Sequence, residues 1–123
     1  MLVYLATPYT LGDVGQNINN AIKLAEQVVE AGHTPYIPVW THFWHIASPH
    51  PWEYWMKIDE VIMLRCDCVL RSDGESNGAD IEIERAQQSG MPVYFSIKKL
   101  KEDNVAPAIA DVTQKGDSRI CRA

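Results

Sequence analysis

The sequence predicts a single α/β domain in which a parallel β-sheet is flanked by helices. Short, continuous apolar runs such as LVYLA at residues 2–6 are typical of strands buried on both faces, as in a parallel sheet. Segments with apolar residues at helical spacing separate these runs, and this alternation indicates right-handed βαβ units. A chain of 123 residues can bury about two-thirds of its unfolded surface, which is enough for one core.

The first third of the chain is predicted to contain a strand, a helix and a second strand. The strand at residues 2–6 is followed by a stretch rich in turn-forming residues, including Pro8 and Gly12. Helical spacing then continues up to Gly32, a residue type typical of the position just after a helix. Its apolar positions are Ile18, Ala21, Ile22, Ala25, Val28 and Val29. Residues 34–39 (TPYIPV) are predicted to form a short strand with proline at its margins.

The middle of the chain is predicted to contain an irregular segment, a helix and a strand. Residues 40–51 are crowded with Trp, His and Pro, and we expect them to be irregular. Pro51 suits the first turn of a helix over residues 52–65. The run CDCVLR at residues 66–71 is predicted to be the next strand.

The remaining elements define the predicted domain boundary. A loop, SDGESNG, leads into a helix over residues 78–89, and MPVYFSI at residues 91–97 is a further strand. We expect residues 1–97 to form the α/β domain. Residues 98–123 are expected to be a C-terminal extension, a short helix followed by a partly disordered tail.

Charge and composition exclude several classes of protein. The chain has 16 acidic and 11 basic residues, and its net charge of −5 argues against polymeric nucleic acid and anionic membranes as partners. No apolar run approaches the roughly 20 residues of a membrane span. The start MLVYLA is too short for a signal peptide and lacks a basic region, and three cysteines are too few for a disulfide framework. We therefore expect a cytoplasmic protein.

Two acidic residues lie beside the apolar faces of their predicted helices. Glu82 flanks a stripe formed by Ala79, Ile83 and Ala86, and Asp59 lies within a stripe formed by Trp55, Ile58 and Ile62. Burial raises the pKa of a carboxyl group, whereas nearby N–H donors lower it. The alternative to a functional role is an exposed or capping carboxylate at Glu82, and a salt bridge or helix-cap contact at Asp59.

The loops that follow the strands are the predicted location of a site. In parallel α/β folds, ligands bind past the carboxyl ends of the strands, which here are followed by residues 7–16, 40–50 and 72–78. Ser76 or Asn77 can cap the helix at 78–89, and Gly78 allows a ligand to approach the backbone. The N-terminus of such a helix offers free N–H groups to an anion.

Three histidines in the 40–50 segment have two interpretations. His42 and His45 form an H-x-x-H pair, and His50 lies close by in sequence. A metal site needs a fixed ligand geometry, which an irregular segment does not provide. We therefore favour aromatic packing or the lining of a base pocket, and we expect neither a metal nor another cofactor.

Three motifs together resemble a known family. They are YLATPY at residues 4–9, D-x₇-D from Asp59 to Asp67, and S-x-G-x-x-x-E-x-x-x-A from Ser76 to Ala86. In this order and spacing the chain resembles the nucleoside 2-deoxyribosyltransferase superfamily over residues 3–95. It is similar to the small phage and bacterial members, and to the 2'-deoxynucleoside 5'-monophosphate N-glycosidases. The resemblance implies a flavodoxin-like (Rossmann-like) fold and a homodimer or higher homo-oligomer whose sites take residues from a neighbouring subunit.

The resemblance also implies roles for individual residues. Glu82 matches the family's nucleophilic glutamate, and Asp59 matches an active-site aspartate on the preceding helix. Ser76 matches the serine that holds the 5'-phosphate in the monophosphate hydrolases, and Tyr4 matches the aromatic residue of the first strand. The other expected substrate-binding residues lie in the loops around the site; they are Thr7, Tyr9, Trp44, Asn77 and Gly78. Among these, Tyr9 and Trp44, together with Trp40, are candidates to stack on the base.

The chain also departs from the family pattern. The loop after the first strand, TPYTLGD, has no Arg, and Glu84 replaces a glycine that follows the nucleophile in the family. We therefore keep three hypotheses. The first is an enzyme that cleaves the N-glycosidic bond of a small nucleoside or nucleotide through Glu82, with water or a second base as acceptor. The alternative is a non-catalytic nucleotide sensor that retains the pocket. A third interpretation is a metal-dependent hydrolase that uses the histidines.

Overall fold

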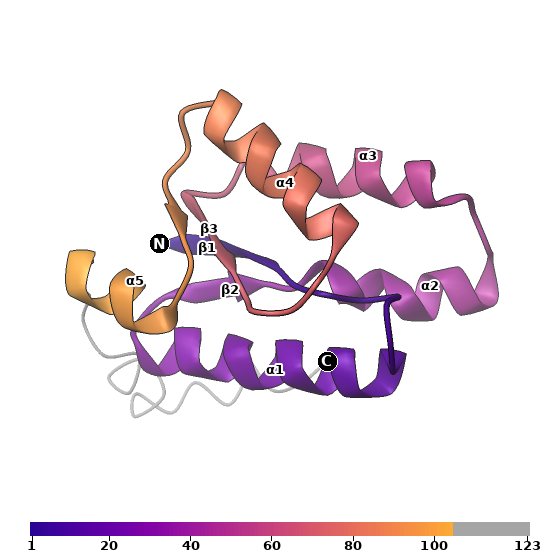
Figure 1. The fold of residues 1–123 in the computed structure, drawn as a ribbon, viewed down its shortest axis with the longest axis horizontal. Helices are drawn as coiled ribbons and strands as arrows, with labels where there is room; N and C mark the ends of the chain where they lie inside the picture. The colour runs from indigo at the N-terminus through magenta and orange to yellow at the C-terminus, as the bar shows by residue number, and fades with distance from the viewer. Residues whose placement is uncertain (105–123) are drawn as a thin grey trace, which may run out of the picture.

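Four parallel strands form the sheet in the order β2-β1-β3-β4, as the computed structural model shows (Figure 1). The structure describes residues 1–104. The strands are β1 (Leu2–Ala6), β2 (Thr34–Tyr36), β3 (Cys68–Arg71) and β4 (Val93–Tyr94). In the central strand β1, Val3 pairs with Cys68 of β3, and Leu2 pairs with Thr34 of β2.

Helices cover both faces of this sheet. They are α1 (Val14–Glu30), the short 3₁₀ turn η1 (Pro38–Trp40), α2 (Thr41–Ala47), α3 (Trp52–Met63), α4 (Asn77–Gln88) and α5 (Ile97–Asp103). Figure 1 shows α1 along one face and α3 with α4 along the other. The predicted fold class, a parallel sheet flanked by helices, is therefore confirmed. No helix within the described residues is long and apolar enough to span a membrane.

The core has two halves because side chains alternate across β1. Val3 and Leu5 face α1 and α5, where Val28 and Leu100 are fully buried. Tyr4 and Ala6 face α3 and α4; the buried side chains around them include Met63, Val69, Ala79, Ile83 and Ala86. Each residue of β1 after Leu2 is therefore enclosed, as expected from its continuous apolar run.

Local signals in the sequence fix several helix ends. Asp13 begins α1 because its Oδ1 accepts a hydrogen bond from the backbone N–H of Gln16 at 3.0 Å. The same helix is followed by Gly32, whose φ of +87° lies in the left-handed region that favours glycine. Ser76 caps α4 through its Oγ, which accepts from the N–H of Ala79 at 3.2 Å.

Some predicted elements were wrong in type or length. The 40–51 segment was expected to be irregular, but it contains the helix α2, since no Gly or Pro interrupts the chain between Val39 and Ser48. The strand predicted at 34–39 ends at Tyr36, because Pro38 starts η1. The strand predicted at 91–97 is reduced to Val93–Tyr94, and α5 begins at Ile97. The tail predicted for the end of the chain lies, from residue 105 onward, outside the described residues.

Candidate functional site

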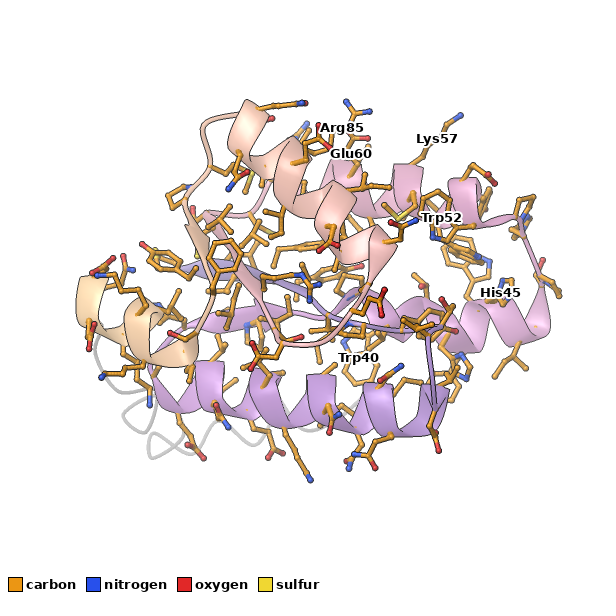
Figure 2. The ribbon with its side chains drawn as sticks, viewed as in Figure 1. Trp40, His45, Trp52, Lys57, Glu60 and Arg85 are labelled. Carbon is orange, nitrogen blue, oxygen red and sulfur yellow. The ribbon has the colours of Figure 1, made fainter. Side chains whose placement is uncertain are left out.

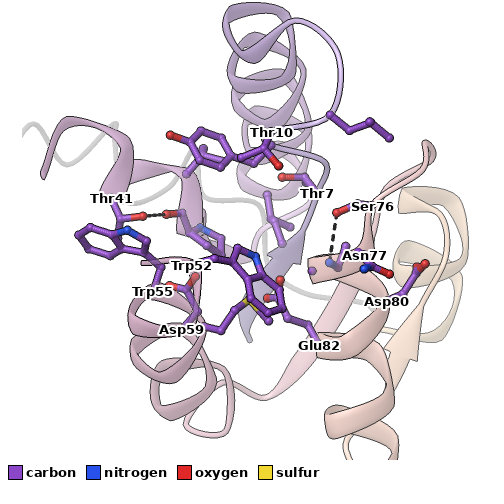
Figure 3. A pocket seen from close by; sticks show the side chains of 18 of the residues that line it. Thr7, Thr10, Thr41, Trp52, Trp55, Asp59, Ser76, Asn77, Asp80 and Glu82 are labelled. Atoms are coloured by element: carbon purple, nitrogen blue, oxygen red, sulfur yellow. Dashed lines mark hydrogen bonds between the residues drawn. The ribbon is translucent and has the colours of Figure 1, made fainter. Parts of the chain in front are cut away.

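A cavity of about 710 Å³ lies at the carboxyl edge of the sheet (Figure 3). Its volume is within the range of roughly 300–1,000 Å³ that small-molecule sites have. Residues from the loops after β1, β2 and β3 line it, together with one face of α3 and the first turns of α4. They are Leu5, Thr7, Tyr9, Thr10, Leu11, Pro38, Val39, Thr41, His45, His50, Trp52, Trp55, Met56, Asp59, Glu75, Ser76, Asn77, Gly78, Ala79, Asp80 and Glu82.

Glu82 lies on the buried face of α4 and reaches the floor of this cavity. The buried residues of α4 are Ala79, Glu82, Ile83 and Ala86, at helical spacing. Glu82 is only 9% exposed, and its Oε2 has no hydrogen-bond partner among the described residues. Burial raises the pKa of Glu82 to about 7. The nearby carboxyl of Asp59 adds to this rise, whereas the hydroxyl of Tyr4 and the guanidinium of Arg71 oppose it.

Asp59 approaches the same floor from α3. Trp52, Trp55, Met56 and Asp59 follow one another at helical spacing along the helix face that lines the cavity. Asp59 is 7% exposed, and within residues 1–104 its Oδ1 has no hydrogen-bond partner. Burial raises the pKa of Asp59 to about 7 as well. No salt bridge or cap accounts for this carboxyl in the part of the chain that the structure describes.

The hydroxyl groups of Tyr4 and Thr7 are two further buried polar groups, Thr7 in the lining of the cavity and Tyr4 behind it. Neither the hydroxyl of Tyr4 nor that of Thr7 has a hydrogen-bond partner within the described residues. Burial raises the pKa of Tyr4 well above its usual value, so its phenol stays protonated and can donate. The Tyr4 hydroxyl lies close enough to Glu82 to oppose the rise in its pKa, although the two groups form no hydrogen bond of normal geometry. Buried polar groups without partners are uncommon, and a bound molecule can satisfy several at once.

An aromatic wall stands on the side of the cavity formed by α2 and α3. It consists of Trp52, Trp55, His45 and His50, and Figure 2 shows His45 and Trp52 at the same end of the molecule. The indole Nε1–H of Trp55 donates to Nδ1 of His45 at 2.9 Å. Because an indole N–H can only donate, this bond fixes the neutral imidazole with its proton on Nε2. His45 therefore has an N–H to offer at the cavity wall.

The histidines of the H-x-x-H pair take different partners. Nδ1 of His42 is hydrogen-bonded to the hydroxyl of Tyr9, whereas His45 is held by Trp55. The ring of His50 stacks on Tyr54 with 3.8 Å between centroids. Within residues 1–104, no three His, Cys, Asp or Glu side chains converge as metal ligands.

A buried arginine holds the loop between β3 and α4. Arg71 donates to the carbonyl oxygens of Ser72 and of Gly74, the latter at 2.8 Å, and its Nη2 lies 3.0 Å from Oδ1 of Asp80. This loop ends at Ser76, the cap of α4. Arg71 therefore fixes the segment that carries Ser76 and the residues after it.

The structure brings most of the predicted site residues together. Seven of the nine line the cavity; they are Thr7, Tyr9, Asp59, Ser76, Asn77, Gly78 and Glu82. Tyr4 lies behind this lining, next to Glu82. The placement predicted for Trp44 was wrong. It lies outside the lining, 46% exposed, and packs edge-to-face on Trp55 with 5.0 Å between ring centroids. Thr41 and His45 lie one turn apart on α2 and line the cavity, whereas the indole of Trp44 packs on Tyr54 and Trp55 outside the lining.

His45 and His50 were expected to pack with aromatic residues or to line a base pocket, but Trp52 and Trp55 were not predicted to belong to the site. A signal for them was present, since Trp52, Trp55 and Met56 precede Asp59 by seven, four and three positions on a helix predicted correctly in type. No comparable signal pointed to the bond between His45 and Trp55, because the pairing of α2 with α3 is not visible in a periodicity.

Comparisons with known proteins extend these observations. No curated protein matches the sequence. Three chains of solved structures match the fold. One is a 2-deoxyribosyltransferase from the psychrotolerant bacterium Bacillus psychrosaccharolyticus, with a TM-score of 0.56 and 18% identity over 76% of this chain and 69% of that chain. At this identity the likeness shows a shared fold. A sequence model of the domain of unknown function DUF7768 matches residues 1–96, and the chain therefore belongs to the DUF7768 family.

Proposed function

We propose that this chain is an enzyme that cleaves the N-glycosidic bond of 2'-deoxyribonucleosides or their 5'-monophosphates, with Glu82 as nucleophile. One observation carries the proposal. Two buried carboxyls, Asp59 and Glu82, meet at the floor of a cavity with an aromatic wall, and each has an oxygen without a partner in the described residues. Burying a carboxyl oxygen without a hydrogen-bond partner costs free energy of folding, and a catalytic site that uses these carboxyls would account for that cost. The shared fold with a 2-deoxyribosyltransferase supports the same reaction class.

The two carboxyls suit the two halves of the first step. An ionised oxygen of Glu82 attacks C1' of the deoxyribose from the face opposite the base, and the C1'–N bond breaks. The electron pair of that bond leaves with the base nitrogen, which takes a proton from Asp59. With pKa values of about 7 for both groups, one can be ionised while the other is protonated near neutral pH. Water or the nitrogen of a second base then attacks C1' and releases Glu82.

The aromatic wall supports binding of the base. Trp52 and Trp55 offer flat apolar surfaces for stacking, and the Nε2–H of His45 can donate to an acceptor on the base edge. Thr7 lines the cavity, and Tyr4 lies behind the lining next to Glu82, where the sugar would sit. Tyr9, from the loop after β1, also lines the cavity.

Base release and a trapped intermediate together test this function. The chain is incubated with a panel of 2'-deoxynucleosides and their monophosphates, with and without a second base, and free and exchanged bases are separated by chromatography. Rapid quenching and peptide mass spectrometry then look for a deoxyribosyl group on Glu82. We expect Glu82→Gln to lose at least about 100-fold in turnover, while Glu84→Gln, on the exposed face of the same helix, retains it. Turnover of Glu82→Gln within a few-fold of the parent would remove Glu82 from the reaction.

The same experiment separates the enzyme from a nucleotide sensor. The loop after β1 has no Arg, which favours the sensor. A sensor would bind members of the panel, as measured by calorimetry, without releasing base from any of them.

Exposed apolar side chains support a homo-oligomer. Val61 on α3 is 64% exposed, and on α2 Phe43 and Ile46 are exposed to a similar degree. Ile81 lies partly buried on α4, away from the Ala79 face. Apolar side chains on two or more neighbouring helices are typical of a surface that a second subunit covers.

A further inference from the structure

The cavity carries an excess of negative charge where a phosphate would need positive charge. Of the residues that line it within the described part of the chain, four are acidic and none is Lys or Arg. The acidic residues are Asp59, Glu75, Asp80 and Glu82. Asp80 lies in the first turn of α4 (Figure 3), and Glu75 directly precedes the cap Ser76. These two carboxylates, here called the acidic rim, lie where the helix N-terminus would otherwise attract an anion.

The cationic side chain closest in sequence to the acidic rim is that of Arg71, and it is already paired within the protein. Arg71 is 8% exposed, and its guanidinium is bound to Ser72, Gly74 and Asp80. Its charge is therefore balanced by Asp80. Glu75 forms no ion pair in the described residues, so the rim keeps a net negative charge beside the free backbone N–H groups of α4.

The neighbouring hollow does not supply a phosphate site either. It has a volume of about 520 Å³ and shares Thr7, Leu11 and Glu75 with the cavity. Lys23 lines it, but Asp73 and Glu75 line it too. A phosphate that reached Lys23 would enter a hollow that is also lined by two carboxylates.

We propose that the acidic rim, and Glu75 above all, makes the site select uncharged 2'-deoxynucleosides and reject their 5'-monophosphates. This proposal rests on the proposed function and narrows its substrate class. Glu75 is then a specificity-determining residue that acts by repelling a dianion. Ser76 acts as the cap of α4, through the bond from the N–H of Ala79.

Paired substrates with the same base test the selectivity. At low salt, we expect kcat/KM for base release from the nucleoside to exceed that from its monophosphate by at least about tenfold. The ratio should fall as sodium chloride is raised to about 0.5 M, because salt screens repulsion between exposed charges. A monophosphate turned over as well as or better than the nucleoside would overturn the proposal.

Three variants assign the effect to its residue. Glu75→Gln is expected to raise kcat/KM for the monophosphate by about three- to tenfold and leave the nucleoside within about twofold. Glu84→Gln removes an equal charge from the exposed face of α4 and should change neither value. Lys23→Gln should also leave the monophosphate unchanged; a loss there would show that Lys23 binds phosphate and would overturn the proposal. The same response in Glu75→Gln and Glu84→Gln would overturn the role of Glu75.

Binding measurements keep this inference separate from the proposed reaction. If neither substrate releases its base, calorimetry with the nucleoside and the monophosphate still measures selectivity. Tighter binding of the nucleoside would then support the acidic rim while the proposed reaction fails. Release of base with a preference for the monophosphate would instead support the reaction and overturn the role of the acidic rim.

Discussion

Asp59 of α3 and Glu82 of α4 are buried beneath one cavity, and the charge of Asp59 helps to raise the pKa of Glu82. Burial raises the pKa of both carboxyls to about 7. Two such groups lose their protons in steps that belong to the pair. Near neutral pH the pair therefore holds about one proton, which leaves one carboxylate to attack and one acid to donate.

The first prediction concerns the pH dependence of base release. Glu82 must be ionised to attack and Asp59 must be protonated to donate, so kcat/KM should be bell-shaped, with its acidic limb near pH 7 and not near the 4.5 of an ordinary glutamate. Asp59→Asn removes the proton donor, so the rate should fall and the alkaline limb should disappear. It also removes the neighbouring negative charge, so the pKa of Glu82 falls and the acidic limb moves to lower pH. Rates from about pH 5 to 9 in both proteins check this. An acidic limb near pH 4.5 in the wild type would contradict the raised pKa of Glu82. An acidic limb that stays in place in Asp59→Asn would contradict the coupling between the two carboxyls.

The second prediction concerns stability. A carboxyl whose pKa is higher in the folded than in the unfolded state costs stability as pH rises between the two values, here from about 4.5 to 7 for Glu82. Glu82→Gln should therefore stabilise the protein at pH 8 by about 2–3 kcal/mol, and much less at pH 5. Urea unfolding followed by circular dichroism at both pH values measures the effect. The control is Glu53→Gln on the exposed side of α3, and an equal change at both pH values would refute the prediction.

The third prediction concerns His45. His45→Phe removes the Nε2–H that the bond from Trp55 fixes, and we expect kcat/KM to fall by about three- to tenfold, mostly through KM. His45→Gln retains an N–H donor and should recover part of the loss. Steady-state kinetics with one good substrate measures both. If the phenylalanine and glutamine variants behave alike, His45 contributes packing and not a hydrogen bond.

The fourth prediction concerns Ser76. Its Oγ accepts from the N–H of Ala79, so Ser76→Ala should lower the free energy of unfolding by about 1 kcal/mol, the usual value for a lost cap. The ratio of kcat/KM for nucleoside and monophosphate should stay the same. Ser76→Asp, which restores a cap, should recover the stability. A selective loss of monophosphate turnover in Ser76→Ala would instead show that the hydroxyl holds a phosphate.

The fifth prediction concerns assembly. We expect light scattering at micromolar concentration to give at least twice the 13.9 kDa of one chain. Ile81→Asp should dissociate this species and lower its activity, because a charge on an apolar interface is costly. Glu26→Gln, exposed on α1 across the sheet, should leave the mass unchanged (Figure 1). A fully active species of 13.9 kDa would show that the site is complete within one chain.

The elements that the sequence predicted well depend on short-range patterns. The run at residues 2–6 became the buried central strand, and the spacing of Ala79, Ile83 and Ala86 became the buried face of α4. The position of Glu82 at the edge of that face follows from 3.6 residues per turn alone. These features need no knowledge of the rest of the chain.

The features that were missed depend on contacts between elements. His45 and Trp55 come from two different helices, and no periodicity relates them. The direction of Trp44 followed from its packing on Tyr54 and Trp55 of α3. The unpaired state of Asp59 within the described residues was equally hidden, because a sequence pattern shows that a carboxyl is buried but not whether a partner reaches it.

All four tryptophans of the chain lie between residues 40 and 55, in η1, α2 and α3. Two of them, Trp52 and Trp55, line the cavity, and Trp44 contacts Trp55. The intrinsic fluorescence of the protein therefore comes from one small region beside the site. A base that stacks there should quench the emission, so an unlabelled titration can follow ligand entry in the wild type and in Glu82→Gln, where no turnover obscures the signal.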